Sequence, residues 1–294
     1  MVHKKTISEM VFDCLNTLFM LVMIAITIYP FWYVIMASLS NSSQLMGARG
    51  WMLLPKGFSF EAYKAVLKNP NILSGYRTTI FIVVVGTAIN ILMTSTGAFV
   101  LTRKKFAIKK FMERMMIFTM YFSGGMIPSY LLVYKFLGLG NSIWALILPT
   151  AISTYNLLIM RTSFDSIPHS LEESAKIDGA NDFVVFLRIV MPLSKAILAV
   201  MILFYGVAHW NSWFSAMLYI RARDKYPLQL ILREILLINS MDSMIGDASG
   251  ADKYMIGESV KYATIIVATL PILFIYPFIQ KYFVKGVMIG AVKE

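Results

Sequence analysis

The sequence predicts an all-α membrane protein with six transmembrane helices. Of its 294 residues, 58% are hydrophobic and only 15% are charged, whereas a soluble domain carries about 25% charged residues. The deficit extends along the whole chain in apolar runs of about 20 residues, the length that a helix needs to cross the hydrocarbon core. These runs do not alternate apolar with polar residues, which argues against an outer-membrane barrel.

Six expected spans follow one another along the chain. They cover residues 15–40, 78–102, 115–134, 141–160, 196–220 and 262–280. The first is longer than the apolar core of a secretory signal peptide, so we expect it to stay in the mature protein. The third is interrupted by Gly124, Gly125 and Pro128, which predicts a broken helix, or one that ends near Phe122 before a re-entrant or surface turn. Residues 58–68 have helical spacing and predict a short packed helix.

Basic residues indicate the orientation of the chain. The loop after the second span carries Arg103, Lys104, Lys105, Lys109, Lys110 and Arg114 against Glu113 alone. The positive-inside rule places this loop in the cytoplasm, so we expect both termini inside and residues 221–258 outside. Such loops account for much of the net charge of +11, so no nucleic-acid partner is expected. Cys14 is the only cysteine, which leaves no internal disulfide and no expected metal site.

A charged island at residues 167–192 separates the fourth and fifth spans. Its ionisable residues are Glu172, Glu173, Lys176, Asp178, Asp182 and Arg188. Ser170 and Glu173 have the spacing of a capping box at a helix start, although Pro168 also fits an earlier start. Asp178-Gly179 predicts the helix end. A second helix is expected to begin near Asn181 or Asp182. From these features alone, the island is either an ordinary cytoplasmic hairpin or a binding element.

The spacing within the island resembles the EAA loop of ABC importer permeases. Glu173-Ser174-Ala175 is followed by three residues, Gly179, nine residues and Ile189-x-Met191-Pro192. The chain departs from the family pattern only at Ser174 and Met191. Further stretches resemble the carbohydrate-uptake branch, especially the maltose-type second permease and permeases for polysaccharide-derived oligosaccharides. The maltose-type permease is resembled at residues 138–141, 155–164, 210–213 and 280–293, and the oligosaccharide permeases at residues 122–133 and 284–293.

The resemblance implies a type I ABC importer permease fold with a cytoplasmic coupling helix and no catalytic residue. The residues implied in ATPase coupling are Glu173, Ser174, Ala175, Asp178, Gly179, Ala180, Ile189 and Pro192. Residues 1–73 would form the first helix and an extracytoplasmic segment, residues 74–283 the transmembrane domain, and residues 284–294 a cytoplasmic tail. The chain contains no GxxxxGK[ST] phosphate loop, so ATP and Mg²⁺ would be bound by a partner.

The implied partners are a second homologous permease, two ATPase subunits, an extracytoplasmic solute-binding protein, a carbohydrate and the lipid of the bacterial cytoplasmic membrane. Candidates for the substrate path are Asn90, Tyr155, Asn156, Trp210, Asn211 and Trp213. For Asn90 we favour a hydrogen bond to a neighbouring helix over a place on the path, whereas the tryptophans could equally form an interfacial belt. By position, Asn239, Asp242, Gly246, Asp247 and Gly250 would contact the binding protein, or else belong to a flexible solvent loop.

Three alternatives are weighed against a sugar importer. The first is an ABC importer permease for a peptide or an amino acid. The second is an ion-coupled secondary transporter or channel, which predicts charged residues within the spans, and these are almost absent. The third is an intramembrane enzyme, which needs a nucleophile with a base or a metal set such as HExxH. The three histidines, His3, His169 and His209, lack that spacing.

Overall fold

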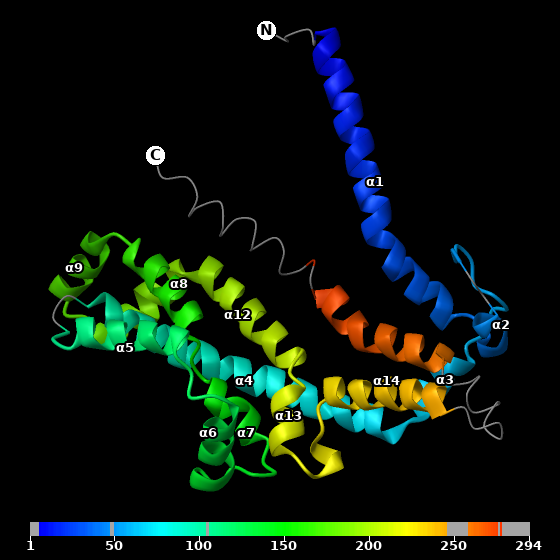
Figure 1. Ribbon diagram of the computed structural model, residues 1–294. Coiled ribbons are helices and arrows are strands. Elements are labelled where there is room, and N and C mark those ends of the chain that lie inside the picture. The colour runs from blue at the N-terminus through cyan, green and yellow to red at the C-terminus, as the bar shows by residue number, and fades with distance from the viewer. Residues whose placement is uncertain (1–5, 48–49, 104–105, 246–257, 276, 278–294) are drawn as a thin grey trace. The chain divides into compact units, whose positions relative to one another are not determined.

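The computed structural model describes residues 6–47, 50–103, 106–245, 258–275 and 277 (Figure 1). Helices form nearly all of the regular structure in these residues. The chain divides into two compact units, which we describe one at a time. Unit 1 combines Met1–Asn69 with Leu232–Thr269, and unit 2 combines Pro70–Ile231 with Leu270–Glu294.

In unit 1, helix α1 (Ile7–Ser38) is exposed along most of its length, and its buried side chains are confined to the last turn. That turn packs on the segment after it, where α2 (Ser42–Met46) begins. Trp32 Nε1 donates to the carbonyl of Leu53 at 3.0 Å, and the hydroxyl of Tyr29 accepts from Met52 N at 3.0 Å. The short helix expected within residues 58–68 is present as α3 (Glu61–Lys68).

The long helix α4 (Pro70–Thr102) is the axis of unit 2. Helix α12 (Lys195–Trp210) runs beside it (Figure 1), and α8 (Thr154–Asp165) packs against both. Their shared core includes Ala98, Phe99, Met160, Phe164, Met201 and Tyr205. A second core joins α4 to α7 (Trp144–Ile147) and α13 (Phe214–Tyr219).

Three helices among the described residues are long and apolar enough to cross a membrane, namely α1, α4 and Glu258–Ile275. The third expected span is a bent pair, with 115° between α5 (Lys109–Tyr121) and Met126–Phe136, which comprises α6 (Met126–Leu131) and the π-helix η1 (Leu132–Phe136). A second bent pair, with 82° at its break, joins Asp182–Leu193 to α12. The count is therefore three, or five if each bent pair is one span.

Two expected spans are not continuous helices, and these predictions were wrong in their local structure. Residues 141–160 contain α7, the 3-10 helix η2 (Leu148–Thr150) and the start of α8, separated by non-helical residues. Pro149, within η2, lacks the N–H that a continuing α-helix needs. In residues 196–220, α12 ends at Trp210 and α13 begins at Phe214.

Candidate functional site

The charged island is built on α9 (His169–Ile177), which ends as expected at Asp178-Gly179. Gly179 has φ +85°, and its N–H donates to the carbonyl of Lys176 at 3.1 Å. The N–H of Ala180 donates to the carbonyl of Ala175 at 2.9 Å. These two bonds make a Schellman motif, which requires a left-handed residue that glycine adopts without strain.

The start of α9 differs from the expected capping box. The N-cap position is Pro168, and Ser170 lies inside the first turn, so its side chain cannot cap the helix as predicted. Pro168 has a fixed φ that suits entry into a helix, and this local preference outweighs the Ser-x-x-Glu pattern. Glu173 and Ser174 are both exposed.

The second helix of the island begins where the sequence placed it. Asn181 Oδ1 accepts from Val184 N at 2.9 Å and caps α10 (Asp182–Val185). Across the turn, Lys176 Nζ lies 2.8 Å from Asp182 Oδ1. The chain continues through the π-helix η3 (Phe186–Val190) and α11 (Met191–Leu193). Ile189 is half-buried in η3, and Pro192 is exposed in α11.

Ala175 and Gly179 are four residues apart, a spacing that predicts one shared helical face for docking, but the small residues of the island do not share one outward face. Ala175 and Ala180 pack against the shared core of unit 2, whereas Gly179 lies beyond the end of α9. A Cβ at Gly179 would meet no atom within 4 Å. The outward face instead carries two apolar side chains, Ile177 at 87% and Phe183 at 68% exposure.

Glu172, which the sequence interpretation passed over in favour of Glu173, is the buried carboxylate of α9, with 8% exposure. Arg103, just after α4, binds it with both terminal nitrogens, at 2.5 Å from Nη1 to Oε2 and 2.8 Å from Nη2 to Oε1. The hydrogen bonds from Arg103 hold the pKa of Glu172 below its ordinary value. The signal that could have found Glu172 is its position three residues before the inward-facing Ala175.

Asn90 of α4 is completely buried, next to the break in the chain between η2 and α8. Its amide Nδ2 donates to the carbonyls of Thr150 at 2.6 Å and Ala151 at 2.9 Å. Its Oδ1 lies 2.7 Å from His209 Nε2. Non-helical backbone is tolerated at membrane depth only where its polar groups find partners in the protein, and Asn90 provides them.

A second side chain supports the same break. The hydroxyl of Tyr205 accepts from Ser153 N at 3.1 Å and lies 2.7 Å from Thr94 Oγ1. Thr94 and Tyr205 are buried and come from α4 and α12. The two helices therefore hold the irregular segment by side-chain bonds to its backbone.

The six path candidates do not gather in one place. Asn156 is buried, whereas Tyr155 is 58% exposed. Trp210 is buried and its ring centroid lies 6.3 Å from that of Tyr76. Asn211 is exposed, and Trp213 is packed on the core that contains α7 and α13.

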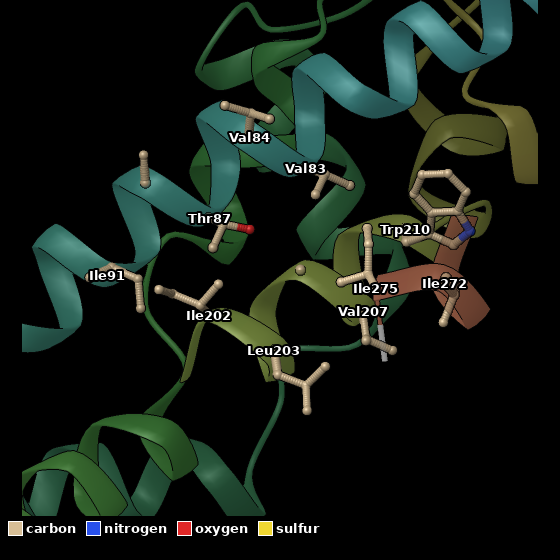
Figure 2. Close-up of a pocket in the computed structure, with 12 residues that line it drawn as sticks. Val83, Val84, Thr87, Ile91, Ile202, Leu203, Val207, Trp210, Ile272 and Ile275 are labelled. Atoms are coloured by element: carbon tan, nitrogen blue, oxygen red, sulfur yellow. The ribbon is translucent and has the colours of Figure 1, made fainter. Parts of the chain in front are cut away.

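Trp210 also lines a cavity of 510 Å³ between α4, α12 and the end of Glu258–Ile275. Figure 2 shows Thr87 and Ile91 of α4 across from Ile202 of α12. The lining is aliphatic apart from Thr87 and Trp210. Within the described part of the chain, Thr87 Oγ1 and Trp210 Nε1 have no hydrogen-bond partner. Two polar groups are too few for the hydroxyls of a sugar.

The residues expected to contact a binding protein fall partly outside the described residues. Asn239 and Asp242 lie on α14 (Leu228–Ile245), so the start of the expected flexible loop is helical. Gly246, Asp247 and Gly250 lie outside the described residues. Near the start of α14, Leu228 N donates to Thr79 Oγ1 of α4 at 2.8 Å.

Residues 91–289 match the family model described as "Binding-protein-dependent transport system inner membrane component". The chain belongs to this family. The match covers more than half of the chain. It includes the whole island and the break between η2 and α8 that Asn90 binds. In the family's terms, the protein is an inner-membrane transport permease.

Individual relatives of the permease are similar over nearly their full length. Protein LplC of Bacillus subtilis is 44% identical over 96% of this chain and 95% of LplC. The polygalacturonan/rhamnogalacturonan transport system permease protein YtcP of the same organism is 42% identical over 96% of this chain and 98% of YtcP. A chain from the crystal structure of a bacterial ABC transporter involved in the import of the acidic polysaccharide alginate matches with a TM-score of 0.87 and 29% identity, over 96% of this chain and 100% of that one.

Proposed function

We propose that the protein is a permease subunit of an ATP-driven ABC importer that carries an oligosaccharide derived from a polysaccharide across the bacterial cytoplasmic membrane. The observation that carries this proposal is the full-length similarity to YtcP, whose name states polygalacturonan and rhamnogalacturonan transport. The structural likeness to a permease of an alginate importer supports the same substrate class. Both of those substrates are polymers of sugars.

We place ATPase coupling on the island, with α9 as the coupling helix. Two exposed side chains of the island support this. Ile177 of α9 and Phe183 of α10 are large and apolar, and exposed apolar groups among charged residues mark protein interfaces. Glu173, Ser174 and Asp178 would line the contact, with Gly179 and Ala180 holding the turn. Ala175, Ile189 and Pro192 would position the island against the transmembrane domain.

The complete importer would contain a second homologous permease, two ATPase subunits and an extracytoplasmic binding protein. ATP and Mg²⁺ would be bound by the ATPases. Six spans with cytoplasmic termini, and the segment from Asn239 to Gly250 facing the binding protein, complete the scheme. Along the path, we keep Tyr155, Asn156, Asn211 and Trp213 as separate candidates for sugar contact, and we assign to Asn90 the support of the break before α8.

Reconstitution of the complex tests this function. The permease, co-purified with its partners, is placed in liposomes with ATP inside and the binding protein outside. Uptake of labelled pectic oligosaccharides is compared with that of a peptide and an amino acid. Sugar-stimulated ATP hydrolysis with uptake is the expected result. Uptake of the peptide in place of every sugar, or transport without ATP, would contradict it.

A further inference from the structure

Arg103 joins two elements of unit 2 through one guanidinium group. Besides its two bonds to Glu172, its Nε and Nη2 donate to Thr102 Oγ1 at 3.2 and 2.9 Å. Its Cζ lies 4.1 Å from the centre of the Phe99 ring. The Phe99 ring in turn lies 5.0 Å from that of Phe186 in η3. Arg103 therefore links the end of α4 to the start of α9, and Phe99 beside it contacts the second half of the island.

The dipoles of α4 and α9 favour this contact. Arg103 follows the C-terminus of α4, where the helix dipole favours a cation, and Glu172 lies in the first turn of α9, where the dipole favours an anion. The side chains of Arg103 and Glu172 are only 20% and 10% exposed. A forked, mostly buried arginine–carboxylate pair fixes orientation as well as distance.

Three other ion pairs of the same region do not tie α9 to α4. Lys176 and Asp182 are 49% and 61% exposed, so their pair adds little rigidity. Arg161 contacts Glu113 of α5 at 2.8 Å and Asp165 of its own helix at 3.4 Å.

We propose that Arg103 and Glu172 are positioning residues that transmit movement of the docked α9 to the cytoplasmic end of α4. This inference rests on the proposed role of α9 as the coupling helix. With the pair intact, α9 cannot shift without carrying the end of α4 along. With the pair broken, α9 still docks and the ATPases still turn over, but α4 no longer follows.

The test uses the complete reconstituted complex and a reporter on α4. Val100, which is 41% exposed on α4, is replaced by cysteine in a Cys14→Ser background, and the new thiol carries an environment-sensitive fluorophore. With Arg103 and Glu172 unchanged, we expect the fluorescence of this reporter to change when nucleotide binds. Glu172→Gln should reduce both the fluorescence change and the sugar imported per ATP about tenfold. Arg103→Lys, which keeps the charge but loses the two-nitrogen bond, should do the same. The ATPases should remain associated in both variants. The exchange of Arg103→Glu with Glu172→Arg should restore part of the fluorescence change and of the import.

Asp165→Asn is the matched control, because it removes a carboxylate that pairs with Arg161 within α8 and leaves α9 unchanged. It should leave signal and import unchanged. A full signal in both Glu172→Gln and Arg103→Lys, or no nucleotide response in the unmodified pair, overturns the proposal. A complex that moves α4 with nucleotide but imports no sugar refutes the proposed substrate and leaves the link standing.

Discussion

Asn90 Oδ1 and His209 Nε2 lie 2.7 Å apart between α4 and α12. One turn before Asn90, Gly86 makes this approach possible, because a Cβ there would lie 2.6 Å from His209 Nε2. The same asparagine binds the carbonyls of Thr150 and Ala151. A glycine and an asparagine at i and i+4 thus connect three segments of unit 2.

Asn90→Leu should destabilise the permease. It leaves two backbone carbonyls and one imidazole nitrogen without their partner, and each buried polar group left unpaired costs about 1–3 kcal/mol. We expect a lower midpoint of thermal unfolding in detergent. Thr96→Val is the control on the same helix, since the exposed Thr96 hydroxyl bonds only to backbone carbonyls of its own helix. An equal effect of both changes would contradict the role of Asn90.

Gly86→Ala should also destabilise the permease, by about 1–3 kcal/mol, because the added methyl overlaps the His209 ring. Gly206→Ala on the facing helix is the comparison. There a Cβ lies 3.9 Å from Thr87 Oγ1, and alanine favours the helix more than glycine. Chemical denaturation of both variants measures the difference, and a stable Gly86→Ala would show that α12 can move away at little cost.

Gly179→Val should abolish sugar uptake by the complex while leaving the affinity of the extracytoplasmic binding protein for the sugar unchanged. The space around Gly179 is open, so the cost arises from its backbone, where φ +85° strains any side chain and a β-branched one most. Gly179→Asn should retain more uptake, because asparagine tolerates this conformation. Equal uptake by the valine variant and the native permease would refute a required turn geometry.

Phe183→Ala should weaken ATPase association without lowering the stability of the permease. The side chain is 68% exposed, so its removal leaves no cavity in the core. Co-purification of the ATPase measures the first effect and thermal unfolding the second. Phe136→Ala, which removes an 83% exposed ring from η1, should leave association unchanged. Loss of ATPase in both variants would point to general damage.

The Arg103–Glu172 pair should stabilise the permease least in acid. Because the folded-state pKa of Glu172 is lowered from 4.5, the pair's contribution is complete above that value and is lost as pH falls through the lower folded-state pKa. The difference in unfolding temperature between the native permease and Glu172→Gln should therefore be constant near neutrality and shrink below about pH 4.5. A difference that grows in acid would contradict the assignment.

The local signals of the island were predictable from the sequence because they depend on single residues. A glycine in a left-handed conformation and an asparagine cap act over four or five positions, and both Gly179 and Asn181 behave as expected. Ser170 was misassigned because a proline two residues earlier offered a better helix start. Short-range chemistry of this kind competes only with its neighbours in the chain.

The long-range bonds were not predictable in the same way. Hydropathy treats residues 141–160 as one span, since it cannot register that Asn90, 60 residues earlier, binds the exposed carbonyls of a break. For the same reason, hydropathy favours neither Glu172 nor Glu173, because the bond of Glu172 to Arg103 joins residues 69 positions apart in the chain. For Asn90, a bond to a neighbouring helix was predicted and is present, but its partners could not be named because they come from segments far away in the sequence.

Helix α1 meets a different kind of requirement from the rest of the permease. Its buried residues are Met36, Ala37 and Ser38, and Tyr29 and Trp32 in the turns before them bond to the segment that follows the helix. The side chains of residues 7–28 are all exposed, so they are not packed into a core within the described chain. Exchange of leucine, isoleucine, valine and phenylalanine along this stretch should therefore be nearly free, provided that it remains apolar. In α4, by contrast, Gly86 and Asn90 leave almost no choice. The sequence of this stretch of α1 therefore needs only to be apolar, whereas the sequence of α4 must satisfy individual contacts.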